Sequence, residues 1–150
     1  MTFETKTIAI GSDHRARGIV DSLAAHMEGN GWSVTKHYGG DADSVDYPVP
    51  AKEVTDAIQS GDACCGVLIC GSGIGMSMAA NKANGIRAAL VHDSHSAEMS
   101  RKHNNANVLC LGERVLGSGT SLDIVDAFVN TDFEGGRHQR RIDLVTELES

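Results

Sequence analysis

Short apolar segments alternate with amphipathic segments along almost the whole chain. Five runs rich in β-branched or apolar residues are bounded by Gly, Asn or Asp, a pattern typical of strands buried in a sheet. The predicted strands are Thr7–Gly11, Trp32–His37, Gly66–Cys70, Ile86–Val91 and Asn107–Leu111.

Between and after these strands, apolar residues recur three or four positions apart, as they do on one face of a helix. In the segment after the third strand, Ile74 and Met78 carry this repeat, and Ala79 and Ala80 are small packing residues. Strands that alternate with helices indicate an α/β fold, with helices on both faces of a five-stranded parallel sheet. The repeats predict helices around residues 19–27, 54–58, 74–82, 96–103, 122–129 and 137–148.

Chemistry in such a sheet is expected just after the strands. Ligands bind outside the carboxyl ends of parallel strands, near the point where the strand order reverses. With the strands in the order 2-1-3-4-5, this point lies between the first and third strands, and Asp13, His14 and Cys70 face one crevice. The other residues that follow strands are His92–Asp93 and Gly112–Arg114.

The stretch Cys70-Gly-Ser-Gly-Ile-Gly75 lies between a predicted strand and a predicted helix. Glycines at such a turn let backbone N–H groups approach an anion at the helix N-terminus. Met76 stands where a dinucleotide fingerprint requires its third glycine, and no lysine completes a P-loop. A phosphatase-type cysteine loop would also need an arginine where Met76 stands. We therefore interpret the loop as a site for an anionic oxygen, with a non-catalytic nucleotide-binding module as the alternative.

Cys70 is the candidate for a reactive group at this loop. A thiol beside backbone donors at a helix N-terminus suits a base or nucleophile that acts next to an oxyanion hole. The other cysteines are interpreted as structural, because adjacent cysteines make a poor disulfide framework and no paired CxxC motif indicates a zinc site. They are Cys64, Cys65 and Cys110.

Arg137 and Arg141 lie four positions apart at the start of the last predicted helix. Cations in a first helical turn oppose the helix dipole, so this placement suggests an anionic partner, and the planar fork of arginine suits phosphate. His14 and His103 are the histidines that we select for proton transfer. We expect His103 and the following Asn104 to lie near the ligand-bearing edge of the sheet.

Composition narrows the range of partners. The chain has 150 residues and a formal net charge of -7, and its length predicts one domain over residues 1–150. The acidic balance and the 4% of aromatic residues argue against nucleic-acid binding. No apolar run approaches the roughly 20 residues that span a bilayer. The segment Met1–Lys6 lacks the basic and apolar pattern of a secretion signal, so we expect a cytoplasmic protein.

Taken together, six motifs resemble the ribose-5-phosphate isomerase B family, which includes the galactose-6-phosphate isomerase subunits. The resemblance runs along nearly the whole chain. It implies a Rossmann-like three-layer αβα sandwich, no cofactor, no metal, and a homodimer or homotetramer with active sites at the subunit interface. The motifs are IAIGSDH (8–14), SVDYP (44–48), ICGSGIGMSMAANK (69–82), GIRAALVHD (85–93), HNNANVLCLGERV (103–115) and FEGGRHQRR (133–141).

The activity that the resemblance implies is the interconversion of D-ribose 5-phosphate and D-ribulose 5-phosphate through an enediolate. This aldose–ketose isomerisation belongs to the non-oxidative branch of the pentose phosphate pathway. Isomerisation of a 6-phosphohexose or a tetrose phosphate is the alternative within the same mechanism, because the motifs do not determine the length of the sugar.

The resemblance also implies roles for single residues. Cys70 matches the family's catalytic base, and His103 matches the residue assigned to opening the sugar ring. The loop that stabilises the enediolate oxygen matches Ser72 with the backbone of Gly71, Gly73 and Gly75. The positions that hold sugar hydroxyls match Asp13, Tyr47 and Asn104. The candidates for holding phosphate are His14, Arg114, Arg137 and Arg141.

Overall fold

A computed structural model describes residues 3–150 of the chain, so the first two residues of the segment considered for a secretion signal lie outside it. Five strands and six helices alternate in this part of the chain, as the apolar pattern predicts. In order they are β1 (Thr7–Ser12), α1 (Arg17–Gly29), β2 (Ser33–His37), α2 (Pro48–Gln59), β3 (Cys65–Cys70), α3 (Ile74–Ala80), β4 (Ala88–Leu90), α4 (Ser94–Lys102), β5 (Val108–Gly112), α5 (Ser118–Val129) and α6 (Arg137–Thr146).

The strands form one parallel sheet in the order β2-β1-β3-β5-β4. The predicted fold class and the predicted neighbours β1 and β3 are confirmed, but the expected order of the last two strands is wrong. All five residues of β5 are buried, which suits an inner strand, whereas β4 has three half-buried residues and lies at the edge. As a result, β5 pairs directly with β3, and Gly112 lies opposite Cys70.

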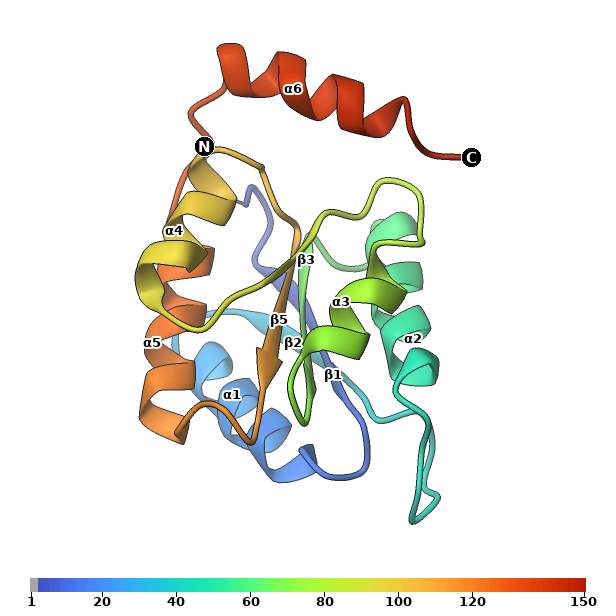
Figure 1. Ribbon diagram of the computed structural model, residues 1–150. Helices are drawn as coiled ribbons and strands as arrows, with labels where there is room; N and C mark the ends of the chain where they lie inside the picture. The colour runs from blue at the N-terminus through green and yellow to red at the C-terminus, as the bar shows by residue number, and fades with distance from the viewer. Residues whose placement is uncertain (1–2) are drawn as a thin grey trace.

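Two layers of helices cover the sheet (Figure 1). On one face, α1, α4 and α5 pack on a core that includes Leu23, Leu109 and Phe128. On the other face, α2 and α3 pack on a core that includes Val54 and Leu68. Figure 1 shows α6 apart from both layers, across the edge at which the strands begin. No helix among residues 3–150 combines the length and the apolar character needed to cross a membrane.

Helix α3 buries a different face from the one that carries the predicted repeat. Ile74 is 48% exposed and Met78 is 63% exposed, whereas Met76 and Ala80 are fully buried. Both pairs have the same spacing of four residues, so periodicity alone cannot choose between them in a helix of two turns. The chain enters the helix through Gly73 in the left-handed conformation, and Met76 and Ala80 face the core between α3 and the sheet. An apolar strip of α3 is therefore left at the surface.

Candidate active site

The Cys70 side chain lies at the carboxyl end of β3, where the chain turns sharply into α3. The thiol is largely buried, and the residue is 7% exposed. The backbone N–H of Gly73 donates a hydrogen bond to its Sγ atom at 3.2 Å. The hydroxyl of Ser72 accepts a hydrogen bond from the N–H of Ile74 at 3.2 Å. The turn therefore presents a sulfur, a hydroxyl and backbone donors at one place, as the glycine-rich motif predicts.

Gly73 is required by both conformation and space. Its φ of +79° lies in the left-handed region, which residues with a Cβ adopt at a cost. A Cβ at this position would lie 2.7 Å from Leu90 Cδ1 and 2.9 Å from the carbonyl carbon of Leu111. The turn can therefore form in this shape only with glycine.

Replacing Gly73 with alanine should lower the free energy of unfolding by about 1–3 kcal/mol, because the turn becomes strained. Urea denaturation followed by circular dichroism measures this change. Gly119→Ala is the matched control, because Gly119 lies in α5 with ordinary backbone angles and no neighbouring atom within 4 Å of the added Cβ. Equal stabilities of the two variants would contradict the requirement for glycine at position 73.

The neighbouring strand β5 brings Arg114 over the glycine loop. The N–H of Glu113 donates to the carbonyl of Cys70 at 2.9 Å, and the N–H of Arg114 donates to the carbonyl of Gly71 at 3.0 Å. The side chain of Arg114 passes over Gly71, where its Cδ atom lies 3.7 Å from the position of a Cβ. This contact depends on the pairing of β3 with β5.

Tyr47 closes the loop from the side of α2. A Cβ on Gly75 would lie 2.6 Å from the Cε1 and Cζ atoms of its ring, so the ring rests directly on the glycine backbone. Tyr47 remains 41% exposed. Part of this side chain is therefore open to solvent beside the loop.

Asp13 and His14 follow β1, which pairs with β3 on the other side. Asp13 is 7% exposed, and its Oδ1 atom accepts a hydrogen bond from the N–H of Arg15 at 3.0 Å. The backbone N–H of Val45 lies 3.0 Å from Nδ1 of His14, and the backbone carbonyl oxygen of Val45 lies 3.3 Å from the same nitrogen. Sequence reasoning missed Val45 because only its backbone takes part. We call Asp13, His14, Tyr47, residues 70–75 and Arg114 the carboxyl-edge cluster.

The structure places four other predicted site residues at the opposite edge of the sheet. His103 and Asn104 follow α4 and lead into the start of β5, so the expectation that they lie near the ligand-bearing edge is wrong. The remaining two, Arg137 and Arg141, lie on α6 at this same edge (Figure 1). At about 3.3 Å per residue, the length of β5 alone separates the two edges by roughly 13 Å.

His138 joins these residues, although the sequence analysis did not select it. Its ring stacks on the ring of His103, with 4.4 Å between centroids and 13° between planes. His138 is 6% exposed, and burial lowers the pKa of its ring, with the charge of Arg137 acting in the same direction. A cavity of about 260 Å³ lies beside the stack, lined in part by Asn104 and Arg141. We call His103, Asn104, Arg137, His138 and Arg141 the amino-edge cluster.

Within residues 3–150, one group of potential metal-ligating side chains occurs, and it overlaps this cluster. Candidate ligand atoms of His103, Glu134 and His138 lie within 4.8 Å of one another. The lone pairs of imidazole nitrogens lie in the ring planes, and the two rings are nearly parallel. They cannot point at one ion unless a ring rotates, so this geometry does not match a formed metal site.

The other candidates from the sequence have structural surroundings. Cys65 and Cys110 are fully buried, and burial raises the pKa of both thiols, which agrees with their structural interpretation. Cys64 is half-buried rather than part of the core, and its Sγ atom lies 2.8 Å from the carbonyl oxygen of Thr5. Asp93, one of the residues that follow a predicted strand, caps α4 by accepting a hydrogen bond from the N–H of Ser96.

Comparisons with known proteins agree with the resemblance in the sequence. The family model described as Ribose/Galactose Isomerase matches residues 8–145. Ribose-5-phosphate isomerase B of Escherichia coli is 41% identical over 144 residues, which cover 96% of this chain and 97% of that protein. D-erythrulose-4-phosphate isomerase of Pectobacterium atrosepticum is 39% identical, covering 93% of this chain and 92% of that protein.

A solved structure extends this likeness to three dimensions. The structure of ribose-5-phosphate isomerase B from Mycoplasma genitalium with bound ribulose-5-phosphate superimposes with a TM-score of 0.86. Its sequence is 40% identical, and the match covers 94% of each chain.

Proposed function

This chain belongs to the ribose/galactose isomerase family and is a sugar-phosphate isomerase of the aldose–ketose type, and we propose that its substrate pair is D-ribose 5-phosphate and D-ribulose 5-phosphate. The observation that carries this proposal is the placement of one thiol, Cys70, in a turn whose Gly73 N–H donates to its sulfur. The full-length similarity to a ribose-5-phosphate isomerase B supports the choice of pentose.

In the proposed reaction, the Cys70 thiolate removes the proton from C2 of the open-chain aldose. The electron pair of the broken C–H bond forms the C1–C2 double bond, and the carbonyl electrons move to O1 to give an enediolate. The proton then returns from the thiol to C1, and the O2 proton is transferred, directly or through solvent, to O1, so that a carbonyl forms at C2 and a hydroxyl at C1. No electron acceptor is needed, because one carbon is oxidised as its neighbour is reduced.

The turn after Cys70 supplies what the enediolate requires. A proton next to a carbonyl is only weakly acidic, so its removal depends on donors aimed at the developing oxyanion. In this proposal Ser72 and the backbone N–H groups at Gly71 and Gly75 provide these donors, while the N–H of Gly73 donates to the Cys70 sulfur. Asp13 and Tyr47 hold sugar hydroxyls, and His14 with Arg114 offers cationic or N–H contacts to an anionic group.

The remaining functions are assigned to the amino-edge cluster of a second copy of the chain. His103 opens the furanose ring, Asn104 holds a hydroxyl, and Arg137 and Arg141 hold the phosphate. The two clusters lie on opposite edges of one chain, so a sugar phosphate cannot contact both within a single copy. We therefore propose a homodimer in which each site combines the carboxyl-edge cluster of one copy with the amino-edge cluster of the other.

Exposed apolar side chains lie next to both clusters, as such an interface requires. On α3, beside the carboxyl-edge cluster, Ile74 and Met78 are 48% and 63% exposed. On α6, beside the amino-edge cluster, Leu144 and Val145 are each 56% exposed. In a symmetric dimer the same two surfaces would meet twice, because each copy presents both.

NMR of ribose 5-phosphate incubated with the protein in D₂O tests the function directly. We expect ribulose 5-phosphate to form with solvent deuterium at C1, because the proton exchanges while it is held by the thiol. No conversion of ribose 5-phosphate would contradict the proposal. Parallel incubations with erythrose 4-phosphate and allose 6-phosphate decide between the pentose and the tetrose or hexose alternatives, of which the tetrose is favoured by the erythrulose-4-phosphate isomerase relative.

Replacing Arg137 with alanine should raise the KM for ribose 5-phosphate by roughly 10- to 100-fold, the size expected for one charged hydrogen bond to phosphate. The turnover number should change much less, because the phosphate lies away from the reacting carbons. Steady-state kinetics measures both values. Arg140→Ala is the control, since Arg140 lies on the same helix and is not assigned to phosphate. An unchanged KM in Arg137→Ala would contradict the assignment.

A further inference from the structure

The segment from His103 to Ala106, which we call the 103–106 loop, joins α4 to β5 and carries two residues of the amino-edge cluster. Among the described residues, Asn105 is the one residue other than glycine with a positive φ, at 45°. Asparagine adopts this region more readily than other residues with a Cβ, and the contacts around it select this conformation. The contacts that hold this loop therefore also determine where His103 and Asn104 point.

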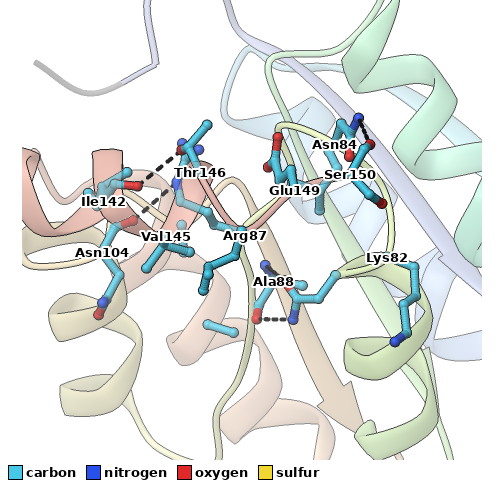
Figure 2. Close-up of a pocket in the computed structure, with 15 residues that line it drawn as sticks. Lys82, Asn84, Arg87, Ala88, Asn104, Ile142, Val145, Thr146, Glu149 and Ser150 are labelled. Atoms are coloured by element: carbon cyan, nitrogen blue, oxygen red, sulfur yellow. Dashed lines mark hydrogen bonds between the residues drawn. The ribbon is translucent and has the colours of Figure 1, made fainter.

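Arg87 contacts the loop from the segment that leads into β4. Its Nε atom lies 3.2 Å from the carbonyl oxygen of Asn104 and 2.9 Å from that of Asn105. Figure 2 shows this guanidinium directed at the Asn104 backbone, while the Asn104 side chain extends away from it. Arg87 lines a cavity of about 570 Å³, together with Lys82 and residues at the end of α6.

Arg101 contacts the loop from the interior. It is 2% exposed, and its Nη1 group donates to Oδ1 of Asn105 at 2.9 Å and to the carbonyl of Ala106 at 2.6 Å. Its Nε atom donates to the carbonyl of Thr131 at 3.3 Å, and the guanidinium lies 4.2 Å from the ring centroid of Phe3. Asn105, the residue with the positive φ, is thus held by Arg101 through its side chain and by Arg87 through its backbone carbonyl.

We propose that Arg87 and Arg101 are positioning residues for the isomerisation, because together they fix the 103–106 loop in the shape that directs His103 and Asn104 at the substrate. This inference rests on the proposed function. It explains why two arginines direct their hydrogen bonds at carbonyl and amide oxygens of one loop. A guanidinium suits this task because its planar group of N–H donors reaches several acceptors with fixed geometry.

Arg87→Met tests the contact of Arg87 with the 103–106 loop, and Lys82→Met is the matched control. Both substitutions remove one cation from the same cavity, but only the first removes hydrogen bonds to the loop. In Arg87→Met, the turnover of ribose 5-phosphate should fall roughly 10- to 100-fold, the effect of misplacing a catalytic group by about 1 Å. Lys82→Met should keep the wild-type rate, and Arg87→Lys should recover part of the loss.

A second reaction separates positioning from general damage. Ribulose 5-phosphate has no ring to open, so exchange of its C1 proton with D₂O needs Cys70 but not ring opening by His103. In Arg87→Met this exchange should fall less than the turnover of ribose 5-phosphate. Equal losses in the two reactions, or equal activities of Arg87→Met and Lys82→Met, would overturn the inference.

Amide hydrogen exchange tests the same inference without activity. The N–H of Asn105 donates to the carbonyl of Arg101, and the N–H of Ala106 donates to that of Ser100. Both amides should exchange faster in Arg87→Met than in Lys82→Met. The same increase is expected in Arg101→Lys, which alters the contacts that Arg101 makes with the loop. Equal exchange rates would overturn the inference. A wild-type protein that does not convert ribose 5-phosphate would instead overturn the proposed function and leave this comparison valid.

Discussion

Replacing Cys70 with alanine should lower the turnover number for ribose 5-phosphate by a factor of roughly 10²–10⁴, the range for loss of a general acid–base group. The thiol lies at the end of β3, and Gly73 donates to its sulfur. Alanine removes the proton acceptor but keeps the backbone donors. The KM should stay close to the wild-type value, because the contacts assigned to phosphate and hydroxyls do not change.

Steady-state kinetics and deuterium incorporation together check this result. The variant should also stop the exchange of the C1 proton of ribulose 5-phosphate, since both directions use the same base. Cys64→Ala is the control, because this half-buried thiol lies near the amino end of β3. Turnover near the wild-type rate in Cys70→Ala would refute the assignment of the thiol as the base.

Mixing two impaired variants should restore activity. Cys70→Ala damages the carboxyl-edge cluster, and Arg137→Ala damages the amino-edge cluster. If each site takes one cluster from each copy, half of the randomly formed dimers combine the variants, and each of these has one intact site. An equal mixture, assayed at a ribose 5-phosphate concentration well below the KM of Arg137→Ala, should therefore reach about one quarter of the wild-type rate in a symmetric dimer.

The doubly substituted chain provides the control for this mixture. When Cys70→Ala and Arg137→Ala are both present in one chain, mixing it with Cys70→Ala creates no intact site, and activity should stay at background. The chains need to be unfolded and refolded together, or co-expressed, so that the copies exchange. A mixture that never exceeds the sum of its separate parts would contradict a site shared between copies.

The sequence is a good guide to the elements of this fold and a weaker guide to their arrangement. Buried β-branched runs such as that around Val67 identify strands, because burial in a parallel sheet removes polar residues from both faces. The order of the strands in the sheet depends instead on how completely each strand is buried. The fully buried β5 takes the inner position beside β3, and the half-buried β4 lies at the edge. The exposed face of α3 was missed because Ile74–Met78 and Met76–Ala80 share one spacing.

Most of the carboxyl-edge cluster was predictable because its members follow strands; Tyr47, which directly precedes α2, was indicated only by the family resemblance. His103 was misplaced by applying the same rule to a residue that precedes a strand. A helix that returns the chain to the start of a parallel strand ends at the amino edge, so topology alone contains the correct answer. Val45 and His138 carried no such signal, since one acts through its backbone and the other through a stack formed across two distant segments.

If each site combines the clusters of two copies, as proposed, their position on opposite edges of the sheet links catalysis to self-association. A sugar phosphate that contacts both clusters is a ligand of the pair rather than of either chain, and its binding free energy adds to that of the contact between the chains. By mass action, substrate should therefore slow the loss of specific activity on dilution, and free chains should accumulate where substrate is scarce. The rate per chain would then depend on the concentration of the enzyme as well as on that of the substrate.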